Sequence, residues 1–112
     1  KAAAMRPAAA RLAEKLANVT VSSPVIPVLH NADVISVTDP EAIKDALVRQ
    51  LYSPVRWVET MQAIAAMGIT QMAECGPGKV LASLAKRIDP ALAGSALTEL
   101  GSFEVFGQKI SA

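Results

Sequence analysis

The chain has 112 residues, of which 52% are hydrophobic and only 4% aromatic, and its formal net charge is +1. The length fits one domain or a piece of a larger one, and the interspersed charges point to neither nucleic acid nor an anionic membrane as a partner. No apolar run reaches the about 18 residues of a membrane span. The single Cys75 excludes an internal disulfide, so we expect a reducing, cytoplasmic environment.

The first predicted element is a helix that ends at about Asn18. Pro7 suits the first turn of a helix, where the missing N–H has no helical partner to lose. Apolar residues then recur at steps of four and three, which is the period of one helix face. These residues are Met5, Ala9, Leu12 and Leu16.

A strand and a turn are predicted next. Val25–Leu29 is a short β-branched run between turn residues, and it indicates a buried strand. Pro27 favours an edge position or a bulge for that strand. Asn31–Asp33 is predicted to be a turn, with Val34–Val37 as a short extended return.

Two helices are predicted in the middle of the chain. Thr38–Glu41 combines a side-chain cap, a proline in the first turn and a glutamate, so a helix should begin there and end near Tyr52. Ser53–Pro54 predicts the start of a second capped helix, and Gly68 is predicted to close it in a left-handed conformation. The residues expected to point inward from this second helix are Val55, Val58, Met61 and Ala65.

The last part of the chain alternates strands and helices. We predict a strand at 69–74, a tight loop at Cys75–Gly78, a helix at 79–88, a strand at Ala93–Leu97 and a loosely held tail at 101–112. The inward residues of the helix are expected to be Val80, Leu81, Leu84 and Ile88. This alternation favours βαβ units around a parallel sheet, and therefore an α/β fold.

Three stretches then resemble one enzyme family. They are Ala4–Ala9, Leu47–Trp57 and the loop Glu74–Leu81, which reads Glu-Cys-Gly-Pro-Gly-Lys-Val-Leu. Together they resemble malonyl-CoA:acyl carrier protein transacylases from about residue 4 to about residue 100. The resemblance implies a partial parallel-sheet, α/β-hydrolase-like acyltransferase domain with helices flanking short strands. Residues 1–112 would be the C-terminal portion of that domain, with the upstream part absent.

The resemblance also implies a chemistry and a set of partners. In the family, a serine is acylated by malonyl-CoA and the malonyl group then passes to the phosphopantetheine thiol of acyl carrier protein, in fatty acid biosynthesis. Malonyl-CoA, acyl carrier protein and the upstream part of the same enzyme are therefore the expected partners, with no metal and no cofactor. Because the chain contains no G-x-S-x-G sequence, we expect it to be inactive alone.

Two positions carry over from the family's catalytic residues. Gln50 matches the position that supports the catalytic histidine. From the last turn of its helix, its main-chain carbonyl could accept the imidazole Nδ1–H and fix the tautomer. The histidine itself is absent, and Lys1 falls at its position. Either residues 1–3 mark a boundary of the sequence, or the chain is an inactive variant, because an exposed lysine is a poor base at neutral pH.

The remaining polar and small residues receive simpler interpretations. Asn31 is a candidate substrate-binding residue at the rim of the pocket, whereas His30 is expected to be structural or on the surface. Cys75 is expected to be a small buried filler, and Met61 and Met67 are expected to belong to the core.

The Gly76–Lys79 loop supports a second hypothesis for the whole chain. A loop that enters a helix N-terminus can bind anions, although this loop lacks the spacing of a phosphate-binding loop. The chain could therefore be a non-catalytic α/β module that binds a partner or a phosphorylated ligand through Gly76–Lys79.

Overall fold

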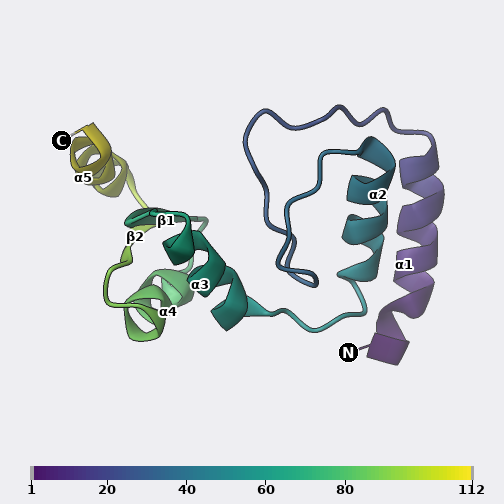
Figure 1. The fold of residues 1–112 in the computed structure, drawn as a ribbon, viewed down its shortest axis with the longest axis horizontal. Coiled ribbons are helices and arrows are strands. Elements are labelled where there is room, and N and C mark those ends of the chain that lie inside the picture. The colour runs from purple at the N-terminus through teal and green to yellow at the C-terminus, as the bar shows by residue number, and fades with distance from the viewer. Residues whose placement is uncertain (1, 112) are drawn as a thin grey trace. The chain divides into compact units, whose positions relative to one another are not determined.

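The computed structural model of the chain describes residues 2–111. It consists of two compact units, one ending at Thr60 and the other beginning at Met61, and each is described by itself. The elements are α1 (Ala2–Ala17), α2 (Pro40–Arg49), α3 (Trp57–Ala66), β1 (Gln71–Cys75), α4 (Val80–Ile88), β2 (Ala93–Leu97) and α5 (Leu100–Ser111) (Figure 1). Helices with a parallel strand pair make this an α/β fold, as predicted.

Helix α1 packs beside α2 in the first unit (Figure 1). The expected apolar face is confirmed, with Ala9 buried and Met5, Leu12 and Leu16 half-buried. The predicted place of Pro7 in the first turn is wrong, because α1 already begins at Ala2 and Pro7 lies inside it. The alanines before Pro7 have the highest intrinsic helix propensity, and this extends the helix upstream of the proline.

The segment between α1 and α2 is mostly irregular. The predicted buried strand at Val25–Leu29 is wrong, because Val25 is 97% exposed. Within residues 2–111, the ladder contact of this stretch is a single isolated antiparallel bridge from Leu29 to Ser36. Pro24 and Pro27 remove two N–H donors from this stretch, so it cannot build a continuous ladder. The turn predicted at Asn31–Asp33 is present.

Helix α2 starts as the sequence predicts. The Asp39 carboxylate accepts a hydrogen bond of 2.9 Å from the main-chain N–H of Ala42, which is a helix N-cap. The helix ends at Arg49 rather than near Tyr52, and the chain continues as a turn.

Helix α3 begins at Trp57, so the predicted start at Ser53–Pro54 is wrong. The main-chain carbonyl of Arg56 accepts the first helical bond, from the N–H of Thr60 at 3.0 Å. The N–H of Arg56 is bonded to the carbonyl of Asn31, and the residues directly before Trp57 are not helical. The left-handed Gly68 after the helix, at φ 83°, is confirmed.

Strands β1 and β2 pair in parallel, with Gln71 opposite Ala93 and Cys75 opposite Leu97, and α4 connects them. The bounds predicted for β2 are confirmed. Gly94 allows α4 to approach closely, because a Cβ built there would lie 2.5 Å from the carbonyl oxygen of Ala82.

Several predictions of burial are wrong. Met61 is 1% exposed, as expected for the core, but Met67 is 54% exposed. Three predicted inward residues are also exposed, namely Val55, Val58 and Val80. A sequence period identifies the apolar face of a helix, but it does not show which positions on that face a neighbouring element covers.

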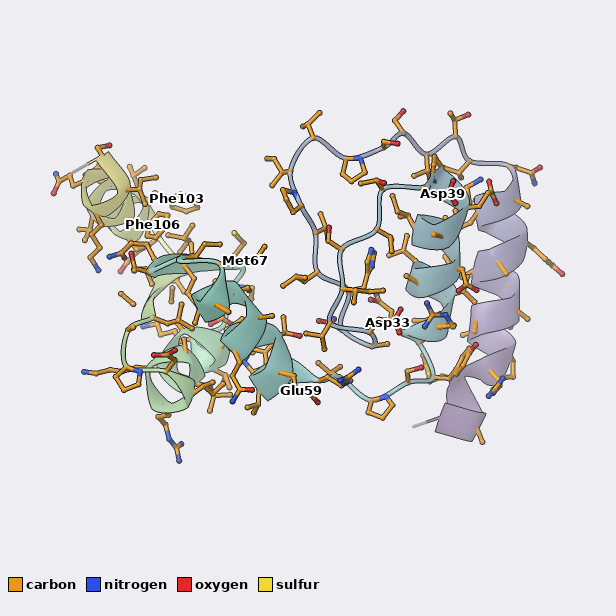
Figure 2. The ribbon with its side chains drawn as sticks, in the orientation of Figure 1. Asp33, Asp39, Glu59, Met67, Phe103 and Phe106 are labelled. Carbon is orange, nitrogen blue, oxygen red and sulfur yellow. The ribbon has the colours of Figure 1, made fainter. Side chains whose placement is uncertain are left out.

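The C-terminal segment is helix α5, so the prediction of a loosely held tail is wrong. The hydroxyl of Ser102 donates to the carbonyl of Glu99 at 2.6 Å and accepts from its N–H at 3.1 Å, which organises the first turn. Phe103 and Phe106 lie one turn apart on this helix (Figure 2). None of the helices within residues 2–111 has the length and apolarity that a membrane crossing requires.

Candidate functional site

The candidate site in the first unit is organised by a six-residue turn from His30 to Ile35. The N–H of His30 donates to the carbonyl of Ile35 at 3.1 Å, and the N–H of Val34 donates to the carbonyl of His30 at 2.9 Å. Val34 has a φ of 57°. A β-branched residue is unfavourable in this left-handed conformation, so the turn is strained and other contacts must hold it.

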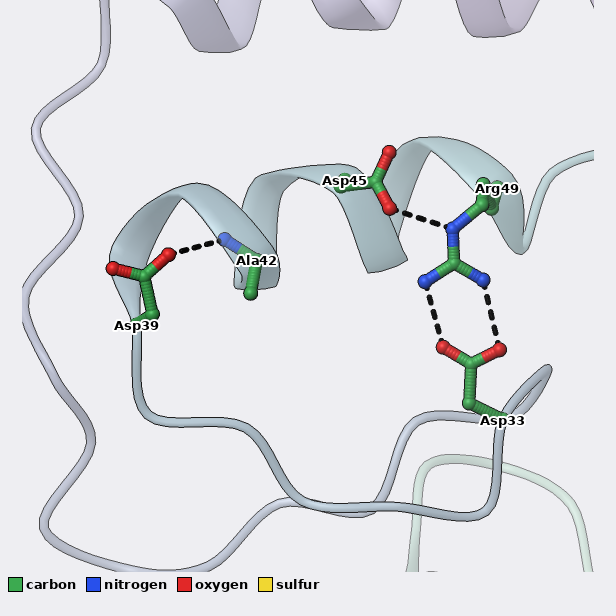
Figure 3. A network of polar contacts seen from close by, with 5 residues as sticks. All are labelled: Asp33, Asp39, Ala42, Asp45 and Arg49. Atoms are coloured by element: carbon green, nitrogen blue, oxygen red, sulfur yellow. Dashed lines mark hydrogen bonds and ion pairs between the residues drawn. The ribbon is translucent and has the colours of Figure 1, made fainter.

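Asp33 attaches this turn to the end of α2. Its two carboxylate oxygens accept hydrogen bonds of 2.8 and 2.7 Å from the two terminal nitrogens of Arg49, and the Nε of Arg49 donates to Asp45 at 2.7 Å (Figure 3). The hydrogen bonds from Arg49 hold the pKa of the Asp33 carboxyl below its usual value. Those from Asp33 and Asp45 raise the pKa of Arg49. All three nitrogens of the guanidinium therefore donate to a carboxylate.

Asn31 attaches the same turn to the residue before α3. Its main-chain carbonyl accepts a hydrogen bond of 3.0 Å from the N–H of Arg56. Arg56 also pairs with Glu59, which raises the pKa of Arg56 and lowers that of Glu59. Asn31 therefore bonds to Arg56 through its main chain, and the substrate-binding role predicted for it stays a prediction.

Gln50 is the C-cap of α2, half-buried and in a right-handed helical conformation. Its N–H donates to the carbonyl of Ala46 at 3.1 Å, whereas no donor within residues 2–111 bonds to its own carbonyl. This carbonyl lies at the negative end of the helix dipole, which suits an N–H donor or a positive charge.

The first turns of α1 lie close to the turn that follows Gln50. The guanidinium carbon of Arg6 lies 4.1 Å from the centre of the Tyr52 ring, a distance typical of a cation–π contact. Lys1, which the sequence aligns with the family histidine, lies outside the described residues.

His30 is buried, with 6% of its surface exposed, and no described residue bonds to its Nε2. It lines a largely apolar hollow with Val28, Val37, Ile43 and Leu47, among others. The expectation that His30 is structural or on the surface fits this position in part, because the ring is inside and not on the surface.

The Gly76–Lys79 loop in the second unit differs from an anion site in one decisive contact. A carboxylate oxygen of Glu74 accepts a hydrogen bond of 3.0 Å from the N–H of Ala82, in the first turn of α4. A negative side chain of the protein already occupies the helix N-terminus, where a phosphate would otherwise bind. The geometry therefore argues against the ligand-binding hypothesis for this loop.

Cys75, at the end of β1, is exposed, so its predicted role as a buried filler is wrong. It is the last residue of the strand and directly precedes the glycine loop. Within the described part of the chain, no three His, Cys, Asp or Glu side chains gather in a way that could hold a metal ion.

Sequence reasoning missed two pairs of residues that organise these regions. Asp33 and Arg49 are separated by 16 positions, and no local pattern joins them. The contact from Glu74 to Ala82 had a usable signal, because an acidic residue precedes the Gly-Pro-Gly loop and a helix follows it.

Comparisons with known proteins agree on one family. The malonyl CoA-acyl carrier protein transacylase of Salmonella typhimurium is 54% identical over 97 residues, covering 87% of this chain and 31% of that protein. An acyl-carrier-protein S-malonyltransferase from Burkholderia pseudomallei is 50% identical with a TM-score of 0.84, over 96% of this chain and 34% of the other. The structure of a type II PKS acyl-carrier protein in complex with its malonyl-transacylase contains a chain that is 43% identical with a TM-score of 0.90. The match covers 96% of this chain and 35% of that one. No protein-family model matches the chain.

These relatives define the class of proteins that the chain resembles, which their names give as transacylases and malonyltransferases. The chain belongs to the malonyl CoA-acyl carrier protein transacylase family. It spans about a third of the length of the curated relatives that it matches.

Proposed function

We propose that this chain is the C-terminal portion of a malonyl-CoA:acyl carrier protein transacylase of fatty acid biosynthesis. The observation that carries the proposal is the likeness to such enzymes, at 54% identity over 87% of the chain. The rest of the enzyme would supply the serine nucleophile, since no G-x-S-x-G sequence occurs here.

The proposed reaction has two half-reactions. The serine oxygen attacks the thioester carbonyl of malonyl-CoA, the carbon–sulfur bond breaks, and the serine proton passes through a histidine to the leaving CoA sulfur. The phosphopantetheine thiol of acyl carrier protein then attacks the malonyl-serine ester, and its proton returns through the histidine to the serine oxygen. Malonyl-CoA, acyl carrier protein and the rest of the same enzyme are thus the proposed partners, in the cytoplasm.

Gln50 is proposed to orient the histidine through its main chain. Its carbonyl is free of donors within residues 2–111, and the contact of Arg6 with Tyr52 holds the start of α1 near the turn after Gln50. A histidine at position 1, just before α1, would then donate its Nδ1–H to this carbonyl. The forming imidazolium would gain from the negative end of the α2 dipole.

The test uses the longer protein that contains this segment, with Lys1→His so that the family histidine is present. We expect radiolabelled malonyl-CoA to label this protein and then holo acyl carrier protein, and we expect no label on the isolated 112-residue chain. A longer protein that folds but acquires no malonyl label would refute the proposal, and so would stoichiometric labelling of the isolated chain.

Two substitutions at Gln50 test its role. Gln50→Ala keeps the main-chain carbonyl, so it should matter less than loss of the histidine. Gln50→Pro also has a carbonyl, but it removes the N–H bond to Ala46 and distorts the last turn at about 3 kcal/mol. It should lower kcat more than it raises KM. If Gln50→Ala is as damaging as removal of the histidine while the fold stays intact, the side chain carries the role.

A further inference from the structure

We infer that Asp33 is a positioning residue: through its paired bonds to Arg49 it makes the His30–Ile35 turn a clamp that fixes the carbonyl of Gln50. This inference rests on the proposed function, because the clamp matters for catalysis if the carbonyl of Gln50 orients the histidine. In this inference Asp33 acts through Arg49 and not on the reacting groups themselves.

The connection that contains Gln50 is attached to the same turn at both of its ends. At the front end, Arg49 directly precedes Gln50 and bonds to Asp33 at 2.8 and 2.7 Å. At the far end, the N–H of Arg56 bonds to the carbonyl of Asn31 at 3.0 Å. The path of the main chain between these two anchors is therefore set by the turn.

The end of α2 needs such support because its helical bonds stop there. The N–H of Gln50 is the last in the α2 pattern, with a bond of 3.1 Å to Ala46, and the following residues form only turns. Terminal helical residues fray when nothing outside the helix holds them. A bidentate arginine–carboxylate contact restrains direction as well as distance, and a single-point contact does not.

The strain in the turn supports a role beyond simple packing. Val34, next to Asp33, keeps a left-handed conformation that a β-branched residue disfavours. Its neighbours hold it there through the bonds between His30 and Ile35 and between Val34 and His30. Backbone strain of this kind persists where the surrounding contacts over-determine a conformation, and it is concentrated at functional sites.

The central experiment compares Asp33→Asn with Asp45→Asn in the longer protein carrying Lys1→His. Both substitutions remove one carboxylate charge from the same guanidinium, but Asp45 belongs to α2 itself and does not attach the turn. We expect Asp33→Asn to lower kcat at least about tenfold with KM unchanged, since a misplacement of about 1 Å can lower a rate about 100-fold. Asp45→Asn should stay within about twofold of the parent, and Asp33→Glu should recover part of the loss.

The pH profile separates positioning from general loss of structure. A carbonyl that accepts the Nδ1–H favours the charged imidazolium, so a displaced carbonyl should lower the pKa of the histidine. The acidic limb of the kcat profile should therefore move to lower pH in Asp33→Asn and stay in place in Asp45→Asn. Equal kcat values and equal profiles for the two variants would overturn the inference.

Amide hydrogen exchange in the 112-residue chain tests the clamp without any activity. Asp33→Asn should speed exchange at the N–H of Arg56 and of Val34 at least threefold, and Asp45→Asn should leave both unchanged. Unchanged exchange in Asp33→Asn would overturn the clamp even if the enzyme is a transacylase. If Asp33→Asn does speed exchange but the longer protein transfers no malonyl group, the clamp stands and the proposed function is refuted. The role of the clamp in orienting a histidine would then be refuted as well.

Discussion

Replacing Gly94 by alanine should separate β2 from α4. The added Cβ would lie 2.5 Å from the carbonyl oxygen and 2.9 Å from the Cα of Ala82, where ordinary contacts of this kind need about 3.5 Å. Both obstructing atoms are main-chain atoms, so no rotamer change can relieve the clash. Overpacking of this severity costs about 2–3 kcal/mol, and the gain of about 0.5–1 kcal/mol from removing a strand glycine offsets part of it. The expected loss is about 1–2.5 kcal/mol.

Urea unfolding followed by far-UV circular dichroism measures this loss. Gly107→Ala is the matched control, because a Cβ there meets nothing within 4 Å and the position lies inside α5. It should stabilise the chain by about 0.5–1 kcal/mol. Adding Ala82→Gly to Gly94→Ala should give no rescue, since the clash does not involve the Ala82 side chain. If Gly94→Ala is as stable as the parent chain, the close approach of strand and helix described here is incorrect.

Three further substitutions test individual contacts in the same assay. The pKa of Asp33 is lowered in the folded state, so its stabilising contribution is present above the unfolded pKa of about 3.8 and is lost as pH falls through the folded value. The stability difference between the parent and Asp33→Asn should therefore be constant between about pH 5 and 8 and should shrink below about pH 4. A difference that persists unchanged at about pH 2 would contradict the lowered pKa of Asp33. Glu74→Ala removes the acceptor for the N–H of Ala82 and should destabilise the chain by about 1 kcal/mol, whereas Glu74→Gln keeps an acceptor and should lose less. Val34→Gly relieves a strain of about 1–3 kcal/mol, but it adds about 0.5–1 kcal/mol of unfolded-state entropy and loses side-chain contacts. It should therefore be neutral or mildly stabilising. A loss of stability above about 1 kcal/mol would show that Val34 is not strained.

Local signals predicted the elements that local contacts determine. Asp39 caps α2 through a hydrogen bond to Ala42, which is only three positions further along the chain. Gly68 follows α3 in the left-handed conformation that glycine favours. The strand Ala93–Leu97 was predicted with its correct bounds, since the break at Asp89–Pro90 isolates it from α4.

The predictions that failed depend on contacts between distant residues or on mixed local signals. The start of α3 is delayed by the bond from Arg56 to Asn31, 25 positions away, which no window along the sequence contains. Helix α5 was mistaken for a tail because Gly101 and Gly107 lower its helix propensity, although Phe103 and Phe106 already had helical spacing. The candidate site shows the same division. The family resemblance predicts a role for Gln50, which stays a prediction, and it gives no sign of the bonds between Asp33 and Arg49.

The bond from Glu74 to Ala82 also fixes how many residues the Gly76–Lys79 loop can contain. It ties the end of β1 to the first turn of α4, so the loop closes a ring of defined length. One inserted residue would leave this ring too long or would rotate α4 by about 100° and move it about 1.5 Å along its axis. Ala85, which is fully buried, would then leave its buried position. Insertions and deletions in natural relatives should therefore avoid this loop and gather in the exposed segment before the His30 turn, where no such ring exists.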